Sequence, residues 1–348
     1  MKPLIFSKIY KLSRFFITRL IYFSQIILQK NKDLETAVLY GDKCISFLSR
    51  TTPFLFKYEL PDNKETNLFD LKFPTPLVSA SFKSDFDIID SWLMLGLGGV
   101  TLKTVMKKRR VGNPRPRLQE IKINNSHGIY NSLGLPGDGV EKFSKNLIKS
   151  KIWNYNRPIG ISIGGDNIEE YYTNLKIINN SLLNFNNYFF ELNISCPNTE
   201  DGKSIEQDPY ALETLLKTIR KNTNKTISIK VSPDSKKEDY LNIGDIVKSF
   251  EKVFVNAGNT LFMSTKQLSI GSNQFSMKGG GVSGPPLFKK TMEVVKIFSD
   301  LNVLTMATGG ISSIDEVIIA KENGAILFGM ATSLVFDPYC IPIINSKL

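Results

Sequence analysis

Eight short apolar runs, rich in β-branched and aromatic residues, recur along residues 67–348, and stretches of helical periodicity separate most of them. This alternation constrains the fold strongly, because parallel strands need long crossover connections, which are usually helices. The apolar runs are Pro76–Ala80, Gly98–Leu102, Ile159–Gly164, Tyr188–Ile194, Thr226–Val231, Lys252–Ala257, Val303–Ala307 and Ala325–Met330. Four of the helical stretches are Tyr210–Lys221, Asp239–Phe250, Leu287–Ser299 and Ser313–Glu322.

Eight strand–helix units over about 270 residues predict an α/β fold, the (β/α)₈ TIM barrel. A doubly wound sheet also alternates strands and helices, but eight units favour the barrel, and no G-x-G-x-x-G turn follows the first apolar run. We therefore predict a barrel domain over residues 67–348. Residues 1–66 are predicted to be an N-terminal helical extension that becomes loop-like near Pro53 and Pro61–Thr66.

The extension is basic and apolar at once. Before the first acid, Asp33, it carries Lys2, Lys8, Lys11, Arg14, Arg19, Lys30 and Lys32. At helical spacing, four of these basic residues share one face, opposite a broad apolar face of Ile5, Ile9, Phe16, Leu20, Phe23 and Ile27. The uncharged run Leu20–Gln29 falls well short of the ~20 residues that span a bilayer. We therefore predict a peripheral protein on the cytoplasmic side of the cell membrane. The alternative is a cytoplasmic protein whose helix pair packs on its own domain, with the lysines in water.

Composition excludes several classes of site. The three cysteines, Cys44, Cys196 and Cys340, form neither a disulfide framework nor a C-x-x-C pair. The single histidine, His127, nearly excludes a histidine-ligated metal, and we expect no metal site. The formal net charge is +11, and a second basic run extends from Lys103 to Arg117. By itself that run fits a solvated loop, a nucleic-acid patch or an anion-binding lid.

Polar and glycine-rich stretches begin where the predicted strands end, which is the edge at which a barrel carries its active site. Thr308-Gly309-Gly310 and Ala331-Thr332 follow the last two strands, where such barrels usually bind phosphate. Asn193-Ile194-Ser195-Cys196-Pro197-Asn198-Thr199 follows the fourth. Pro197 biases Cys196 towards an extended conformation, in which its sulfur can act as a base or nucleophile at the barrel mouth. A small buried cysteine without chemistry is the alternative.

Five strings in order carry a family resemblance: GNPRPR (Gly112–Arg117), NISCPNT, ISIKVSPD with Lys230, GGGVSGPPL and TGGISS. Together they resemble dihydroorotate dehydrogenase, over roughly residues 68–336. The resemblance implies a (β/α)₈ barrel that carries FMN and oxidises dihydroorotate to orotate in pyrimidine (UMP) biosynthesis.

The resemblance combines the two classes of this family. The N-terminal extension and GNPRPR resemble the membrane-bound, quinone-using class, in which a serine is the base. Cys196 in that position resembles the soluble class, as do Thr101–Thr104 and Asn131–Pro136. Ala80–Ser84 also departs from the lysine-containing pattern of the quinone class. The resemblance thus implies an active site of the soluble class in a chain whose N-terminal extension resembles the quinone class. A membrane quinone is the expected electron acceptor.

Site residues follow from the same resemblance. It implies that Cys196 is the base, and that Lys103 lies near flavin and substrate and stabilises the substrate anion. Further substrate contacts are expected from Asn131, Leu135, Asn193, Asn198 and Asn256. Residues expected to bind FMN are Ala80, Ser81, Thr104, Ser162, Asn193, Lys230, Gly284, Gly309, Gly310, Ala331 and Thr332. Thr199–Ser204 resembles a mobile cover, and His127 is expected to be a packed loop residue.

Three other functions stay open. The same oxidation with fumarate or another soluble acceptor needs no membrane. A tRNA dihydrouridine synthase is also an FMN barrel with an active-site cysteine, and its RNA would match the +11 charge. Its C-terminal RNA-binding domain has no counterpart in the sequence, so we expect no nucleic-acid partner. The non-enzyme alternative is a membrane-bound scaffold protein whose barrel is catalytically inactive. This chain also has no cysteine cluster for iron–sulfur export of electrons to NAD.

Overall fold

A computed structural model describes residues 1–195 and 205–348. Its centre is a closed barrel of eight parallel strands, in the order β10-β13-β14-β3-β4-β7-β8-β9. All eight predicted strands are present, within a few residues of the expected bounds. They are β3 (Leu77–Ser79), β4 (Gly99–Val105), β7 (Ile159–Ile163), β8 (Tyr188–Asn193), β9 (Ile227–Val231), β10 (Val253–Ala257), β13 (Thr305–Thr308) and β14 (Leu327–Met330).

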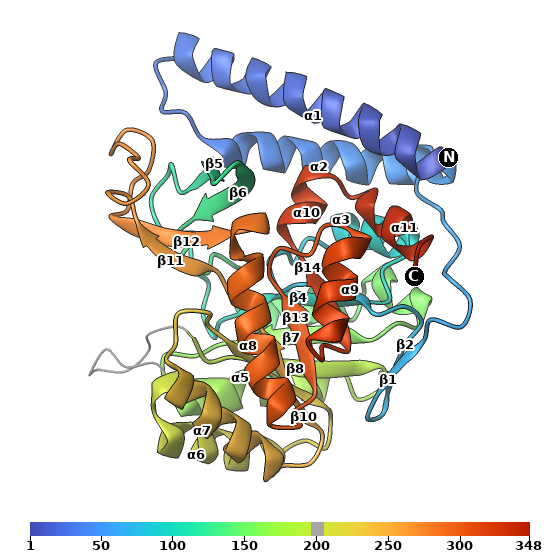
Figure 1. Cartoon of the computed structure of the whole chain (residues 1–348), viewed down its shortest axis with the longest axis vertical. Helices are drawn as coiled ribbons and strands as arrows, with labels where there is room; N and C mark the ends of the chain where they lie inside the picture. The colour runs from blue at the N-terminus through green and yellow to red at the C-terminus, as the bar shows by residue number, and fades with distance from the viewer. Residues whose placement is uncertain (196–204) are drawn as a thin grey trace.

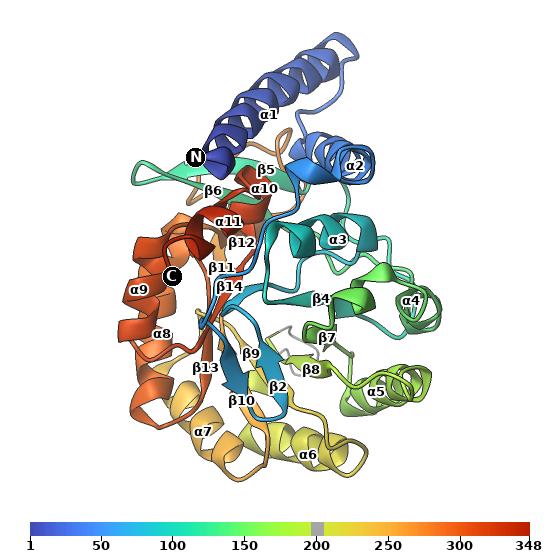
Figure 2. The same cartoon turned by 90° about the vertical axis from the view of Figure 1, so that its right-hand side faces the viewer.

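Helices surround this barrel as an outer ring, which Figure 2 shows end-on with the small β1–β2 hairpin in front. The hairpin joins β1 (Thr66–Leu68) to β2 (Leu71–Phe73). The ring contains α3 (Phe86–Leu95), α4 (Val140–Leu147), α5 (Ile168–Ser181), α6 (Pro209–Arg220), α7 (Lys237–Lys248), α8 (Phe288–Asp300) and α9 (Ile314–Glu322). The short helices α10 (Thr332–Phe336) and α11 (Cys340–Asn345) complete the C-terminus.

The barrel interior is layered because side chains two positions apart on a strand point to the same face. Its lower layer is apolar: Val78, Phe189, Phe254, Met306 and Leu327 pack in one cluster with Leu68, Leu71 and Phe73 of the hairpin. Two residues further along several of these strands, the inward positions become polar: Glu191 follows Phe189, Asn256 follows Phe254, and Thr308 follows Met306. The hairpin therefore closes the amino end, and the carboxyl end carries the polar groups.

A four-stranded antiparallel sheet, which the sequence did not predict, stands beside the carboxyl end of the barrel. Its order is β11-β12-β6-β5, from β11 (Leu261–Ser264), β12 (Gly279–Ser283), β6 (Ser126–Asn131) and β5 (Leu118–Ile123). The pairing of β12 with β6 joins chain segments about 150 residues apart, opposing Gly281 to Asn131. The sheet thus brings the end of β6 to the barrel mouth.

Two antiparallel helices, α1 (Lys2–Ile27) and α2 (Leu34–Thr51), lie together on one side of the barrel (Figure 1). Asp33 caps α2 by accepting a hydrogen bond from the Glu35 N–H, 2.9 Å away. Helix α1 packs towards α11, where the Ser7 hydroxyl donates to Asp337 at 2.6 Å. The division of the chain into an extension at 1–66 and a barrel at 67–348 stays a prediction.

Helix α1 turns a mixed side inward, with Phe6 and Tyr10 partly buried against Tyr339, and its broad apolar face outward. Its buried residues are Ser7, Thr18, Tyr22 and Gln25. Ten large apolar side chains are each more than half exposed: Leu4, Ile5, Ile9, Leu12, Phe15, Phe16, Leu20, Phe23, Ile26 and Ile27. The helix pair packs on its own domain, as the cytoplasmic alternative expected, but the broad apolar face of α1 points outward. Among the described helices, none combines the length and the hydropathy needed to cross a membrane.

Candidate active site

A buried polar network occupies the barrel interior at the carboxyl ends of β8, β9 and β10. The Ser81 hydroxyl, just after β3, donates to Glu191 Oε1 at 2.6 Å and lies 3.2 Å from Lys230 Nζ. The other Glu191 oxygen, Oε2, accepts from Asn256 Nδ2 at 2.7 Å. Asn256 and Glu191 are fully buried, and Asn256 Oδ1 has no hydrogen-bond partner in the described part of the chain.

A second polar chain runs across β4, β7 and β8. The Asn193 amide donates to Thr104 Oγ1 at 3.0 Å, and Thr104 shares a 2.9 Å hydrogen bond with Ser162. At its other end Asn193 Oδ1 accepts from the Ser195 hydroxyl at 3.1 Å, and Ser195 in turn accepts from Asn259. The structure therefore brings together the sequence-predicted residues Thr104, Ser162 and Asn193.

The glycines after β12 and β13 form a cradle that side chains would fill. Gly284, Gly309 and Gly310 all have positive φ, at 92°, 147° and 80°. A Cβ at Gly309 would lie 2.2 Å from Thr291 Oγ1, and one at Gly284 would lie 2.8 Å from Thr332 Cγ2. Close to these turns the Thr308 hydroxyl is buried without a partner among the described residues. Glycine turns of this kind let backbone N–H groups approach an oxyanion closely.

Ala331 and Thr332 complete the same corner. Thr332 begins α10, directly after β14, and its hydroxyl donates to Ser283 at 2.9 Å. Ala80 lies on the other side of β14 in the barrel order, where its N–H donates to Met330 O at 2.8 Å. Predicted phosphate residues and predicted flavin-ring residues thus meet around one end of β14.

Lys103, a half-buried residue of β4, is the cation predicted to bind the substrate. Its ammonium group donates to Pro136 O at 2.9 Å. Burial lowers the pKa of Lys103 to about 8, and the positive charges of Lys83 and Arg117 act in the same direction, whereas Glu35 opposes them. Pro136 directly follows Leu135, so the hydrogen bond to Pro136 O places Lys103 close to Leu135. Leu135 is half-buried and has a φ of 49°. Asn131 ends β6, with Nδ2 3.3 Å from Gly281 O.

Acidic residues at the N-cap and in the first turn of α2 bind the basic run that precedes β5. Arg115 Nε pairs with Asp33 at 2.5 Å, and Arg117 makes two hydrogen bonds to Glu35, at 2.8 and 2.9 Å. Burial alone would raise the pKa of Glu35, but the Arg117 hydrogen bond and charge outweigh it, and the pKa is lowered. Asp42 pairs with Lys83, whose backbone O accepts from Lys103 N. Helix α2 is therefore tied to segments that lead into the polar layer.

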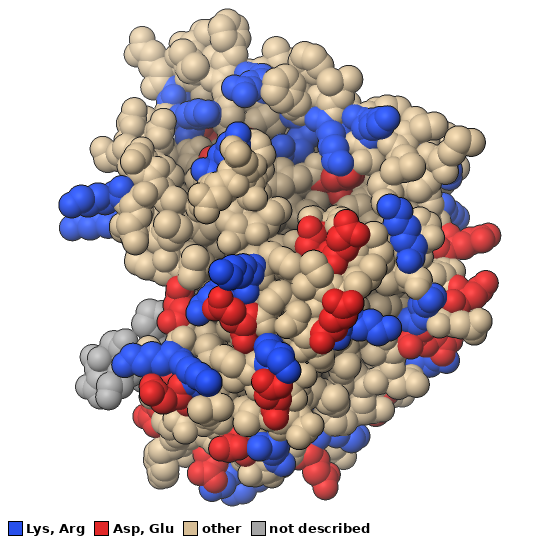
Figure 3. Space-filling view, in the orientation of Figure 1, with Lys and Arg blue, Asp and Glu red and all other residues tan. Residues whose placement is uncertain are grey.

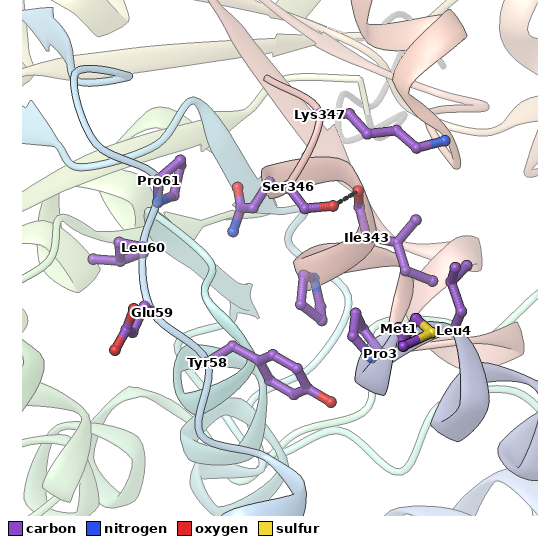
Figure 4. A pocket seen from close by; sticks show the side chains of 12 residues that line it. Met1, Pro3, Leu4, Tyr58, Glu59, Leu60, Pro61, Ile343, Ser346 and Lys347 are labelled. Carbon is purple, nitrogen blue, oxygen red and sulfur yellow. Dashed lines mark hydrogen bonds between the residues drawn. The ribbon is translucent and has the colours of Figure 1, made fainter.

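Three sizeable cavities lie away from this layer. One of about 350 Å³ lies between the start of α1, residues 58–61 and α11, and Figure 4 shows Tyr58, Leu60, Pro61 and Ile343 around it. Cavities of about 440 and 490 Å³ are lined by residues that precede β7, β8, β10 and β13. These positions are at the amino ends of strands, whereas the polar groups are at the carboxyl ends.

Two of the predicted site residues, Cys196 and Asn198, lie outside the described residues, as does the predicted cover Thr199–Ser204. His127 differs from expectation: it is exposed on β6 opposite Lys122, rather than packed in a loop. Three polar residues of the site were missed, namely Glu191, Ser195 and Asn259. The indication for Glu191 was its place in an apolar strand, two residues before Asn193 and hence on the same face.

Comparison with known proteins gives consistent findings. The model of the family described as "Dihydroorotate dehydrogenase" matches residues 64–348. A protein of Christiangramia forsetii named "Dihydroorotate dehydrogenase (quinone)" is 30% identical over 310 residues, covering 84% of this chain and 86% of its own. One of Malacoplasma penetrans named "Dihydroorotate dehydrogenase B (NAD(+)), catalytic subunit" is 28% identical over 280 residues, covering 80% and 88%. A solved structure, "DHODH in complex with ferulenol" from Eimeria tenella, has a TM-score of 0.72 at 20% identity, covering 88% of this chain and 89% of its own. That likeness supports the fold.

Proposed function

The chain belongs to the dihydroorotate dehydrogenase family, whose function is to oxidise dihydroorotate to orotate in pyrimidine biosynthesis, and we propose that it does so with FMN bound at the polar layer. The observation that carries the proposal is the set of buried polar groups with unfilled hydrogen bonds at the carboxyl ends of the strands. Buried polar groups are almost always hydrogen-bonded. Asn256 Oδ1 and Thr308 Oγ1, which have no partner among residues 1–195 and 205–348, therefore support a polar ligand at this position.

The residues present are suitable for FMN. The cradle of Gly284, Gly309 and Gly310, with Ala331 and Thr332, would hold the phosphate and ribityl chain. Ala80 and Ser81 would contact the ring, together with Thr104, Ser162 and Asn193, and the Lys230 ammonium would supply a positive charge beside it. When bound, FMN accepts the hydride that leaves the substrate.

The chain's own residues would handle the substrate and one proton. Cys196 would take the proton from C5 of dihydroorotate, a base role that its thiolate can serve. Lys103, positively charged below about pH 8, would neutralise the substrate carboxylate. Asn131, Asn193, Asn198 and Asn256 would hold the ring edge, since an amide both donates and accepts. The half-buried Leu135 would cover the ring beside Lys103.

This function has a direct test. Purified protein should be yellow, and anaerobic addition of L-dihydroorotate should bleach the flavin absorption. A flavoprotein that dihydroorotate fails to bleach would contradict the substrate, and tRNA would be tested next.

A second part of the proposal concerns the outward face of α1: we propose that it binds the surface of an anionic membrane, and that a membrane quinone reoxidises the flavin. Contiguous exposed apolar surface of this extent marks an interaction site. Lys8, Arg19 and Lys30 are exposed beside it. Figure 3 shows scattered Lys and Arg side chains among mostly uncharged residues over α1 and α2. An apolar face flanked by basic residues suits an anionic lipid surface.

Two measurements separate the acceptors. Full-length protein should bind vesicles of anionic phospholipid and bind zwitterionic vesicles more weakly. After anaerobic bleaching, a ubiquinone or menaquinone should restore the flavin spectrum. Restoration by fumarate alone would retain the substrate and contradict the quinone.

A further inference from the structure

Glu191 is a charged side chain in the interior of the barrel, where burial normally excludes an unpaired charge. It is fully buried on β8, and its neighbours in the register are the small residues Ser162 on β7 and Ser228 on β9. Two serines flanking the position leave room for a carboxylate inside the barrel. None of the residues that the family resemblance singled out is Glu191, so its role has to come from its contacts.

The direction of each hydrogen bond around Glu191 is fixed by chemistry. An ammonium group only donates, so Ser81 Oγ, 3.2 Å away, must accept from Lys230 Nζ. The Ser81 proton is then directed at Glu191 Oε1, 2.6 Å away. Asn256 Nδ2 approaches the second carboxylate oxygen at 2.7 Å. Glu191 therefore accepts at both oxygens, as an ionised carboxylate does.

This arrangement decides which way the Asn256 amide faces. The two ends of an asparagine amide have nearly the same shape, and only hydrogen-bond partners select its orientation. Because a carboxylate cannot donate, the NH₂ end of Asn256 has to face Glu191. The Oδ1 end then faces away, and it is the atom left buried without a partner among the described residues.

We propose that Glu191 is a positioning residue of this site: it fixes the Asn256 carbonyl as the acceptor for a ring N–H of the substrate and joins it to the Lys230–Ser81 pair. The inference rests on the proposed function, because it takes dihydroorotate and orotate as the ligands. These pyrimidines carry two ring N–H groups, and an acceptor fixed in place selects for one of them. The same carboxylate is linked through Ser81 to Lys230, which is expected beside the flavin ring.

The test uses Glu191→Gln in the full-length protein and measures the dissociation constant of orotate by flavin quenching. Glutamine has the same size, but one of its two ends donates, so Asn256 no longer faces a group that can only accept and both of its orientations become possible. We expect orotate to bind at least about tenfold more weakly, as loss of an oriented buried hydrogen bond implies. The flavin midpoint potential should also become more positive, because the substitution removes a negative charge from the group linked to Lys230 through Ser81. Thermal unfolding gives a third readout, which does not depend on turnover.

Asp337→Asn is the matched control. Asp337 is also buried and also accepts from a serine hydroxyl, Ser7 Oγ at 2.6 Å, but it lies at the contact with α1, where it pairs with Lys11 Nζ at 3.0 Å. This control should leave the orotate dissociation constant and the flavin potential unchanged. If Glu191→Gln only lowers the melting temperature, as the control can, and keeps wild-type orotate affinity and potential, the positioning role is wrong.

Orotates methylated on N1 or on N3 sharpen the test. Wild-type protein should discriminate against one of the two isomers, the one that lacks the N–H facing Asn256, and Glu191→Gln should lose most of that discrimination. Equal discrimination in both proteins would overturn the proposal. Failure of the proposed function looks different, since wild-type protein would then neither bleach with dihydroorotate nor bind orotate.

Discussion

The barrel mouth and the outer face of α1 depart from the usual burial pattern in opposite directions. In the mouth, Glu191, Asn256 and Lys230 are polar and buried. On α1 three of the four buried residues are polar, and apolar side chains such as Leu20 and Phe23 are 66% and 61% exposed. Each departure costs free energy in the isolated chain. The difference indicates the partner of each region: a polar ligand inside the barrel, and an apolar surface outside the helix.

The two regions also differ in how they are joined. Helix α2 lies between them and forms ion pairs with the barrel through Asp33, Glu35 and Asp42. Helix α1 reaches the barrel through Ser7 and Lys11 on Asp337, and through Arg14 on Glu120. These polar contacts, together with Phe6 and Tyr10 packed against Tyr339, hold the inner side of α1, and the broad apolar face points outward. If the two regions bind different partners, changes in one should leave the partner of the other unaffected.

The largest expected effect belongs to the barrel mouth. Cys196→Ala should slow flavin reduction by dihydroorotate about 10²–10⁴-fold, as loss of a general base does. FMN content, orotate binding and vesicle binding should stay at wild-type levels. Stopped-flow reduction under anaerobic conditions measures the rate, and a near wild-type rate would exclude Cys196 as the base.

The second effect belongs to α1. Leu20→Glu/Phe23→Glu should weaken binding to anionic vesicles about 100-fold or more, because burying each large apolar side chain contributes about 1.5–3 kcal/mol. Cosedimentation measures the affinity, and dihydroorotate should still bleach the flavin at the wild-type rate. The matched control is Leu183→Glu, at an apolar residue of the barrel that is 76% exposed. Similar losses in both proteins would show that general charge, rather than the α1 face, governs binding.

A third, smaller effect concerns the glycine cradle. Gly309→Ala should weaken FMN binding about tenfold, because a side chain at its positive φ costs about 1–2 kcal/mol. The added Cβ would also meet Thr291 Oγ1 at 2.2 Å. Released flavin fluorescence measures the dissociation constant. Gly137→Ala is the control, since its Cβ meets no atom within 4 Å. Unchanged FMN affinity in Gly309→Ala would place the phosphate elsewhere.

The smallest effect is a pH dependence. The pKa of Lys103 is lowered to about 8, so its charge is present below that pH and is lost above it. Orotate affinity should therefore fall above about pH 8, by at most tenfold per pH unit. In Lys103→Arg the charge persists, and this fall should disappear. A wild-type affinity that is flat between pH 7 and 9.5 would contradict a role for Lys103 in holding the anion.

The sequence predicted the barrel well and the features around it less well. The eight strands are continuous apolar runs, which buried parallel strands require. The sheet of β5, β6, β11 and β12 was missed because one face of β5 is exposed and polar, and because β12 begins with three glycines. Asn124 and Asn125, both at positive φ, mark the β5–β6 turn and were its available signal.

Within the site, residue types were easier to predict than orientation. Family motifs located Ser81, Asn193, Asn256 and Lys230, and the structure brings them into two hydrogen-bonded groups. Glu191 lies in no such motif; its spacing from Asn193 indicated only a shared face of the strand, and its partners became visible in the structure. For α1, the helical period separated an apolar face from a basic one. Which face packs inward depends on residues distant in the sequence: Asp337 is 330 residues from its partner Ser7, and Glu120 is 106 residues from its partner Arg14.

In this account the barrel mouth binds a polar ligand and the outer face of α1 binds a membrane. The most direct test of these two partners is reoxidation of the bleached flavin by a long-chain ubiquinone held in anionic vesicles. Wild-type protein, reduced anaerobically with dihydroorotate, should recover its spectrum when these vesicles are added. Leu20→Glu/Phe23→Glu should recover at least about tenfold more slowly, yet react with a water-soluble short-chain quinone as fast as wild type. Equal recovery of both proteins from vesicle-bound quinone would contradict the account, as would a wild-type flavin that dihydroorotate does not bleach.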